Sequence, residues 1–449
     1  MHKRIQIIGG GLAGCEAAWQ LAERGIGVTL YEMRPVRTTD AHQSDRLAEL
    51  VCSNSLKSDQ GPSASWLLKE ELRRLGSLLL SAAAKARVPG GHALTVDRVV
   101  FADEVTSAIE AHPGIDVRRE EVGEIDPEQP TIIATGPLTS DGLAQSIAKL
   151  TGSGRLFFYD SISPIVDAHT IDRSVVFAAS RYDKSLFSAG DGTGDYLNCP
   201  FTKAEYEHFV DELLAAQATE AHIASDLHLP GDTPFFEACL PVEEIARRGR
   251  DTLRFGPMKP MGLTDPRTGR RPYAVVQLRQ ENLRADSYNL VGFQNHLRFG
   301  EQKRVMRLIP GLEKAEFLRF GQIHRNTYIN APELLDEALR LRSWPNVFFA
   351  GQISGVEGYV ESIATGLAVG MLAGAYLQGE PVRPFPRETA IGALCHYISH
   401  AEAKRYQPAN IAFDLFPPPE PNPRDRAERQ GLICERALAR LNEYMAVHV

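Results

Sequence analysis

The sequence is poor in cysteine, and its few cysteines form no recognisable motif. The six thiols of the 449-residue chain are Cys15, Cys52, Cys199, Cys239, Cys395 and Cys434, and no two of them form a Cys-x-x-Cys pair. This spacing fits neither a zinc site nor a thioredoxin-type dithiol, so we expect no bound metal. In a reducing compartment most of these thiols should be small buried side chains.

Long apolar runs are also missing. No stretch approaches the roughly 20 apolar residues that a membrane-spanning helix needs. The chain starts Met1-His2-Lys3-Arg4 and passes directly into a short apolar strand and glycines, whereas a signal peptide has a longer apolar segment and a small-residue cleavage site. We therefore expect a cytoplasmic protein with no membrane partner. Its oligomeric state stays open.

The negative charge of the chain is distributed unevenly. The formal net charge is −8, yet residues 241–325 contain 17 Lys and Arg against 9 Asp and Glu, which leaves −16 for the remainder. Such asymmetry is typical of a polyanion partner such as a nucleic acid. A solvated surface with scattered charges explains the composition equally well.

The length and the strand pattern predict two domains, one inserted into the other. Short apolar strands are expected at residues 4–8, 28–31, 131–134 and 347–350, with a helix after the first strand. The first two strands and that helix form a β-α-β unit. We expect an α/β fold in which a doubly wound domain with a parallel sheet contains residues 1–197 and 323–449, including a C-terminal tail. Residues 198–322 would form a smaller inserted α/β domain.

A glycine-rich turn follows the first predicted strand. It consists of Gly9, Gly10, Gly11, Leu12, Ala13 and Gly14, and Glu32 lies at the end of the next strand. The glycines permit a tight turn, close approach of the backbone to a pyrophosphate and close packing of helix on strand. The helix N-terminus attracts the phosphates, and the carboxylate can bind ribose hydroxyl groups. The sequence therefore predicts a dinucleotide site.

Two later strands favour FAD by resemblance to flavoproteins of the two-dinucleotide type. One ends in Ala134-Thr135-Gly136, and the other ends in Ala350-Gly351-Gln352. Many flavoproteins have an aspartate after the last glycine. Gln352 departs from that pattern and indicates a particular subgroup.

The chain resembles the TrmFO family, the tRNA uracil-5-methyltransferases that depend on folate and FAD. The resemblance covers most of the chain up to about residue 370, and the tail after 380 matches only loosely. The matching runs are 9–14, 32–35, 51–55, 134–140, 195–200, 235–244, 255–263, 276–281, 291–294, 324–328 and 355–362.

The resemblance implies a reaction, its cofactors and its partners. The product is 5-methyluridine at the T-loop uridine of tRNA, and the carbon donor is methylenetetrahydrofolate. Reduced FAD supplies two electrons and carries the carbon, and NADH or NADPH reduces the flavin again. Reaching a uridine in the folded elbow of tRNA requires that the base be flipped out.

The same resemblance suggests roles for individual residues. Carbon 5 of uracil becomes nucleophilic when a thiolate adds to carbon 6, and Cys239 is the candidate for that addition. Cys52 is the second functional thiol, acting on the flavin-bound carbon or in proton removal, and which thiol performs which step stays open. The candidates for the flavin end of the site are Gly358, Tyr359 and Glu361.

Three other functions are compatible with parts of the sequence. The chain could be a flavoprotein that modifies wobble uridines, although such relatives are longer and lack the Phe-Glu-Ala-Cys run of residues 236–239. It could be a small-molecule NAD(P)H:FAD oxidoreductase, which leaves the basic segment unexplained. It could also be a non-catalytic tRNA-binding protein with structural FAD, which trapping of a covalent adduct would exclude.

Overall fold

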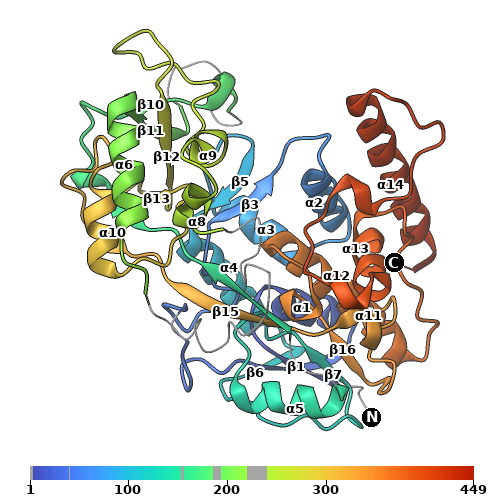
Figure 1. Cartoon of the computed structure of the whole chain (residues 1–449). Coiled ribbons are helices and arrows are strands. Elements are labelled where there is room, and N and C mark those ends of the chain that lie inside the picture. Colours follow the sequence, from blue (N-terminus) through green and yellow to red (C-terminus); the bar gives the residue numbers. More distant parts are fainter. Residues whose placement is uncertain (1–3, 40, 153–155, 186–193, 220–239, 449) are drawn as a thin grey trace.

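Two β-sheets of different kinds form the framework of the chain (Figure 1). The computed structural model describes residues 4–39, 41–152, 156–185, 194–219 and 240–448, and every structural statement below concerns these residues. One sheet is parallel and takes strands from both ends of the chain. The other is antiparallel and takes its strands from the middle.

The parallel sheet has five strands in the order β16-β7-β1-β2-β6. Their bounds are Arg4–Ile8 for β1, Gly27–Tyr31 for β2, Ile115–Arg118 for β6, Thr131–Ile133 for β7 and Val347–Phe349 for β16. Strands β7 and β16 consist of buried residues and β1 buries its three isoleucines, as expected where both faces of a parallel sheet are covered. The predicted α/β fold with a parallel sheet is therefore confirmed.

Helices α1 (Leu12–Ala22) and α12 (Tyr359–Gln378) pack closely against each other. A Cβ atom at Gly366 of α12 would lie 2.3 Å from the carbonyl oxygen of Ala13, and one at Gly370 would lie 2.9 Å from that of Ala17. Only glycine permits such close approach of two backbones. Helix α12 packs on the side of α1 that carries Ala13 and Ala17, and nearly all of α1 is buried.

Helix α12 is also long and apolar enough to span a membrane by length and composition, with a mean hydropathy of 1.4. However, 83% of its apolar window is buried inside the fold. The core of a folded domain gives the same composition, so this helix is weak evidence for a membrane segment.

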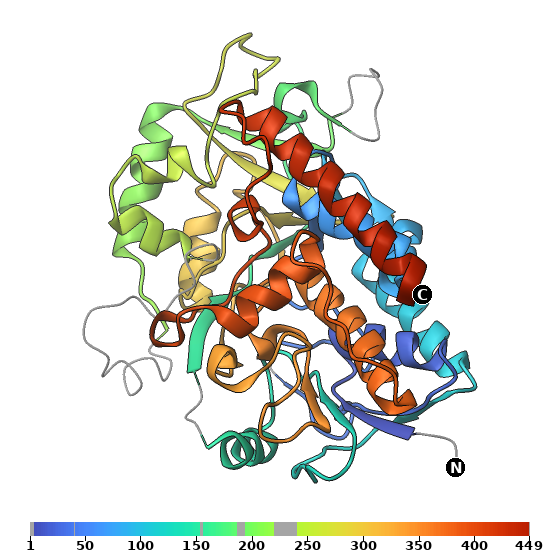
Figure 2. The same cartoon turned by 90° about the vertical axis from the view of Figure 1, so that its right-hand side faces the viewer.

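Among the described residues, seven more helices and a small sheet belong to the part of the chain that contains the parallel sheet. Figure 2 shows α14 running along the outside, where it contacts α2. The helices are α2 (Ala64–Arg74), α3 (Leu78–Lys85), α4 (Arg98–Ala111), α5 (Asp141–Thr151), α11 (Ala331–Leu334), α13 (Ala390–His400) and α14 (Arg426–His448). A small sheet contains β3 (Ser55–Ser58), β4 (Arg87–Val88) and β5 (Ala93–Val96).

The second sheet is antiparallel, with strands in the order β10-β11-β12-β13-β9-β14. These strands are β9 (Ile165–Asp167), β10 (Phe177–Ala178), β11 (Tyr196–Phe201), β12 (Ala274–Gln280), β13 (Ser287–Leu290) and β14 (Phe317–Arg319). Helices α6 (Lys203–Ala215), α8 (Val242–Arg247), α9 (Thr252–Phe255) and α10 (Phe299–Met306) accompany them. A separate hydrophobic core, from Val166 to Ala315, lies between sheet and helices.

The sequence suggested that the insertion starts at residue 198. The second hydrophobic core begins earlier, at Val166. Strands β9 and β10 have only three and two residues, too few for an alternating pattern to be visible in the sequence. The chain passes between the two parts through β8 (Leu156–Ser161) and β15 (Ile323–Tyr328), which pair antiparallel. Short 3₁₀ turns occupy Ala168–Thr170, Arg181–Asp183, Gln352–Ser354, Ala403–Arg405 and Phe413–Leu415.

Candidate cofactor and catalytic site

A cavity of about 350 Å³ opens beside the carboxyl ends of β1, β2, β7 and β16. Ligands of open α/β sheets bind at this edge. Most of the residues expected at the site line the cavity: Gly9, Gly10, Gly11, Leu12, Ala13, Glu32, Cys52, Thr135, Gly136, Gly351, Gln352, Gly358 and Tyr359. Gly14 and Glu361 do not line it, and both act on residues that do.

The glycine turn after β1 has the geometry that a bound pyrophosphate requires. A Cβ atom at Gly14 would lie 1.8 Å from the carbonyl oxygen of Gly9, so this glycine lets α1 start directly against the turn. A Cβ atom at Gly11 would meet no protein atom within 4 Å, and Gly11 faces the cavity. Gly11 is the N-cap residue of α1, and no side chain caps this end of the helix. The turn therefore fits phosphate oxygens held at a helix N-terminus.

Glu32 directly follows β2, and its carboxylate is not fully used by hydrogen bonds within the protein. Its carboxylate accepts hydrogen bonds from the backbone N–H of Gly10 at 3.0 Å, and from the backbone N–H and Nε of Arg34 at 3.0 and 2.8 Å. A carboxylate has about four acceptor sites, so about one is left for a ribose hydroxyl. Burial alone would raise the pKa of Glu32, but the hydrogen bonds and charge of Arg34 outweigh it and lower the pKa.

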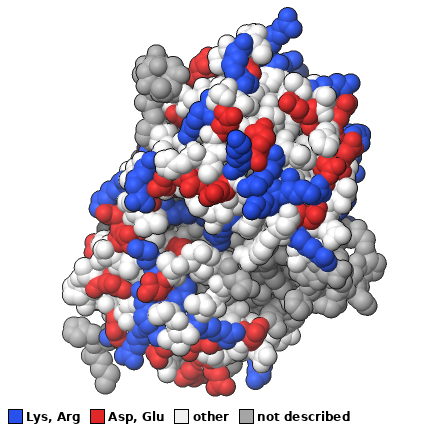
Figure 3. Space-filling model, turned by 90° about the vertical axis from the view of Figure 1, so that its left-hand side faces the viewer, with Lys and Arg blue, Asp and Glu red and all other residues white. Residues whose placement is uncertain are grey.

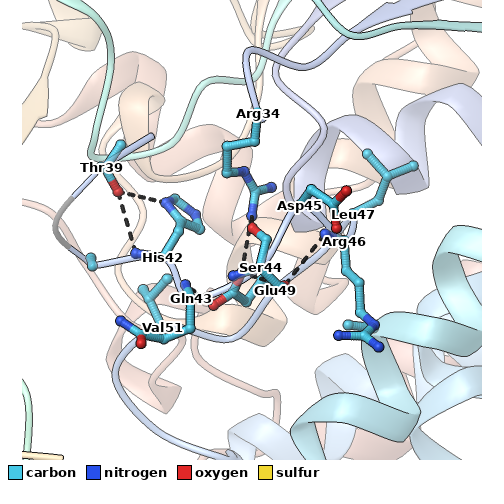
Figure 4. Close-up of polar contacts among 12 residues, drawn as sticks. Arg34, Thr39, His42, Gln43, Ser44, Asp45, Arg46, Leu47, Glu49 and Val51 are labelled. Carbon is cyan, nitrogen blue, oxygen red and sulfur yellow. Dashed lines mark hydrogen bonds and ion pairs between the residues drawn. The ribbon is translucent and has the colours of Figure 1, made fainter. Parts of the chain in front are cut away.

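The loop between β2 and Cys52 is held by polar contacts (Figure 4). Glu49 accepts hydrogen bonds from the backbone N–H groups of Gln43 and Ser44 and pairs with Arg34 at 3.1 Å. The side chain of Arg34 is 2% exposed. One guanidinium group therefore connects Glu32 with the loop that closes this side of the cavity.

An ion pair between a half-buried lysine and a buried glutamate lies at the opposite end of the cavity. Lys57 lines the cavity, and its Nζ lies 2.6 Å from Oε1 of the fully buried Glu361. A Cβ atom at Gly358 would lie 2.4 Å from the other carboxylate oxygen, which explains a glycine at φ = 109°. Asn326 also lines the cavity, is 1% exposed, and neither amide atom has a partner among the described residues. An orphaned buried amide on this wall fits a polar ring of a bound ligand.

Cys52 is the described cysteine that the structure brings to the cavity. It is half-buried, whereas Cys15, Cys199, Cys395 and Cys434 are buried in the cores. Burial raises the pKa of all four buried thiols, to about 12 for Cys395 and Cys434. They are therefore inert at neutral pH. Cys239, the other predicted catalytic thiol, lies outside the described residues.

Three arginines that the sequence analysis did not single out donate hydrogen bonds to the segment around Cys52. Arg98 of α4 donates to the carbonyl of Leu50 at 2.9 Å. Two more come from the antiparallel sheet: Arg319 of β14 donates to the carbonyl of Val51 at 3.1 Å, and Arg279 of β12 donates to the hydroxyl of Ser53 at 2.9 Å. Arg279 belongs to the matched run 276–281, which was the available signal in the sequence. The segment from Leu50 to Ser53 is thus fixed by both parts of the chain.

The basic middle of the chain also supplies exposed arginines. Figure 3 shows a band of Lys and Arg side chains, interrupted by Asp and Glu, on the side of the molecule that carries the antiparallel sheet. Four exposed arginines of the charge-rich segment, here called the arginine group, are Arg247, Arg248, Arg270 and Arg271.

One cluster of side chains has atoms suited to a metal ion. The ligating atoms of Glu337, His396 and His400 lie within 4.8 Å of one another. None of the three lines the cavity. His396 and Glu337 already form an ion-pair contact at 3.2 Å, and the two imidazole rings stack.

Comparison with known proteins agrees with this arrangement. Residues 4–381 match the family described as Glucose inhibited division protein A. The methylenetetrahydrofolate–tRNA-(uracil-5-)-methyltransferase TrmFO of Solibacter usitatus is 67% identical over 449 residues, which covers 99% of each chain. The TrmFO of Koribacter versatilis is 63% identical, again over 99% of each chain. This chain belongs to the TrmFO family.

A solved structure supports the fold at lower similarity. The form I crystal structure of Aquifex aeolicus GidA superposes with a TM-score of 0.71 at 17% identity, covering 99% of this chain and 75% of that one. At this identity the likeness shows the fold alone.

Proposed function

We propose that the chain is a methyltransferase that converts a uridine of tRNA to 5-methyluridine, with methylenetetrahydrofolate as carbon donor and FAD as bound cofactor. The observation that carries the proposal is the position of Cys52. A half-buried thiol shares one cavity with a dinucleotide-type glycine turn. The names of full-length relatives at 67% and 63% identity agree with this activity.

Different residues of the cavity are proposed to bind different parts of FAD. The turn from Gly9 to Gly14 would hold the pyrophosphate and Glu32 the ribose of FAD. Lys57, Asn326 and Tyr359 would face the ring system at the other end. Reduced flavin supplies the two electrons that separate a methylene group from a methyl group. NADH or NADPH is the reductant that we propose for the flavin.

The two thiols would share the chemistry on the uracil ring. Cys239 is the proposed nucleophile toward carbon 6, an assignment that rests on the resemblance of its sequence segment. Cys52 is proposed to act at the flavin end, where the structure brings it beside Tyr359. The substrate uridine would be the one in the T-loop, and the arginine group would contact phosphates of the tRNA. We propose a cytoplasmic location for this reaction.

The wobble-uridine alternative is less well supported. The proteins that modify wobble uridines are longer, whereas this chain and two TrmFO relatives match over 99% of both lengths. A small-molecule oxidoreductase would leave the exposed arginines without a role.

Nucleoside analysis tests the proposal directly. The purified protein is incubated with tRNA that lacks 5-methyluridine, methylenetetrahydrofolate and NADH or NADPH, and the digested nucleosides are identified by mass spectrometry. We expect 5-methyluridine that depends on the folate and on the reductant, and none with S-adenosylmethionine alone. Product formed from S-adenosylmethionine would contradict the flavin route, and a modified wobble uridine would favour the alternative.

A second experiment tests the nucleophile. A tRNA containing 5-fluorouridine cannot lose the substituent on carbon 5 as a proton, so the covalent adduct should survive denaturation. We expect wild-type protein to form this adduct and Cys239→Ser not to form it. Adduct formation by Cys239→Ser at the wild-type yield, together with none from Cys52→Ser, would exchange the roles of the two thiols.

A further inference from the structure

The hydroxyl of Tyr359 makes three polar contacts with the segment that carries the reactive thiol. Tyr359 is the first residue of α12, and its hydroxyl oxygen accepts the backbone N–H of Cys52 at 2.8 Å and that of Ser53 at 3.1 Å. The sulfur of Cys52 lies 3.0 Å from the same oxygen. Residues more than 300 positions apart in the sequence therefore meet at one atom.

Hydrogen-bond accounting fixes the direction of the third contact. A backbone N–H can only donate, so both N–H groups use the lone pairs of the tyrosine oxygen. With its acceptor positions filled, the oxygen has only its own hydrogen left to offer, and the contact with sulfur must be an O–H donor to a sulfur acceptor. Burial raises the pKa of Tyr359 well above its usual value, and a negative charge on Cys52 raises it further, so the hydroxyl keeps its hydrogen at neutral pH.

The charged side chains near Cys52 favour a negatively charged sulfur. The guanidinium groups of Arg98, Arg279 and Arg319 bind the residues on either side of Cys52, and the charge of a Cys52 thiolate favours all three cations. Two carboxylates on the elements around this segment are themselves paired with cations: Glu281 with Arg98 at 2.7 Å and Glu49 with Arg34 at 3.1 Å. Lys57, on the same side of the cavity, pairs with Glu361. These surroundings stabilise a thiolate more than a neutral thiol.

We propose that Tyr359 is a positioning residue whose hydroxyl donates to the sulfur of Cys52 and holds it as a thiolate. The role deepens the proposed function, on which it rests: a thiolate here can accept a proton from carbon 5 of the uracil ring. The S–H bond forms as the C–H bond breaks, and the electron pair of that bond stays with the ring. Tyr359 keeps its own hydrogen throughout and fixes where the sulfur stands.

The test measures the ionisation of Cys52 without any turnover. FAD-loaded protein is treated with iodoacetamide at a series of pH values, and alkylation is read by mass spectrometry on the tryptic peptide 47–57, which contains Cys52 as its single cysteine. Because only the thiolate reacts, the rate shows an inflection at the pKa of the thiol. Wild type is compared with Tyr359→Phe. The matched control is Tyr376→Phe, which removes a hydroxyl from the same helix, where it donates to Asn346 at 2.9 Å.

We expect the inflection of Tyr359→Phe to move upward by about one pH unit, so that alkylation below it slows about tenfold, while Tyr376→Phe follows the wild type. An unchanged or lowered inflection in a Tyr359→Phe protein that retains FAD would overturn the proposal. If Tyr359→Phe does not fold, 3-fluorotyrosine at position 359 supplies a stronger donor of nearly the same shape. It should lower the inflection, and an unchanged or raised inflection would again overturn the role. Failure of the nucleoside assay with a shifted inflection would instead count against the reaction.

Discussion

The contact between α1 and α12 gives a quantitative prediction about stability. Gly366→Ala would place a Cβ atom 2.3 Å from the carbonyl oxygen of Ala13 and 2.7 Å from its Cα. Both are backbone atoms that cannot turn away, so the helices must separate by about 1 Å to reach normal van der Waals distance. Overpacking of this kind costs about 1–3 kcal/mol. Replacing a helical glycine by alanine returns up to about 1 kcal/mol.

We therefore expect Gly366→Ala to lower the free energy of unfolding by about 1–2 kcal/mol. Because α1 begins at the glycine turn, the displaced helix should also reduce the fraction of protein that retains FAD. Unfolding is followed by circular dichroism, and flavin release is followed by fluorescence in the same denaturant series. Both signals are needed because cofactor loss and unfolding need not coincide in a protein of this size.

Gly374→Ala is the matched control on the same helix. Its added Cβ would lie 3.4 Å from the end of the Ile26 side chain and 3.6 Å from Cδ of Arg24, which are ordinary contacts with mobile groups. This variant should gain helix propensity and become slightly more stable, by up to about 1 kcal/mol. Equal stability and equal FAD content of Gly366→Ala and Gly374→Ala would show that the two helices can separate without cost.

Three further predictions concern cofactor, RNA and pH. Gly11→Val should lose FAD with little change in the free energy of unfolding, since its Cβ meets no protein atom within 4 Å. Gly14→Val should lose both FAD and stability, because its Cβ would lie 1.8 Å from the Gly9 oxygen. Stoichiometric flavin absorbance in both variants would contradict this prediction. Alanine at all four positions of the arginine group should weaken tRNA binding and flatten its dependence on salt, with unchanged FAD content; unaltered affinity in a filter-binding titration would move the RNA site elsewhere. Burial, and after it the charge of Arg34, lowers the pKa of His42 from 6.5 to about 4. Between pH 4 and pH 6.5 the folded protein therefore binds fewer protons than the unfolded chain. The free energy of unfolding should therefore rise between pH 4 and pH 6.5, by about 3 kcal/mol in total, and fall again as the pH is lowered. Denaturation of His42→Gln should show a flatter pH profile.

Local pattern predicted the parts of the fold that depend on neighbouring residues. The strands expected at 4–8, 28–31, 131–134 and 347–350 appear at Arg4–Ile8, Gly27–Tyr31, Thr131–Ile133 and Val347–Phe349. Each is an apolar run next to a glycine or an acidic turn, and that combination is visible in the sequence. The glycine turn was located for the same reason, because its conformation and the close approach of α1 exclude other side chains.

The rest of the site could not be predicted because it is assembled by tertiary contacts. Lys57, Arg98 and Arg319 belong to no matched run. Arg279 and Asn326 lie in matched runs, but nothing local shows that they approach the cavity, and all five residues lie on different elements. Glu361 was expected at the flavin end, yet the structure buries it beneath Lys57. A carboxylate at the start of an apolar helix gives no sign in the sequence of whether it faces the ligand or supports the residue that does.

Helix α12 contacts both the segment around Cys52 and the start of α1 at the glycine turn. Its first residue, Tyr359, holds the backbone and sulfur of Cys52, while Gly366 and Gly370 let its middle lie directly on α1 and the glycine turn. A displacement of this one helix must therefore act at both ends. We accordingly expect Gly366→Ala to shift the pH inflection of Cys52 alkylation as well as weaken FAD binding, while Gly374→Ala changes neither. An unshifted inflection in a Gly366→Ala protein that has lost FAD would show that the two ends of the cavity are held independently.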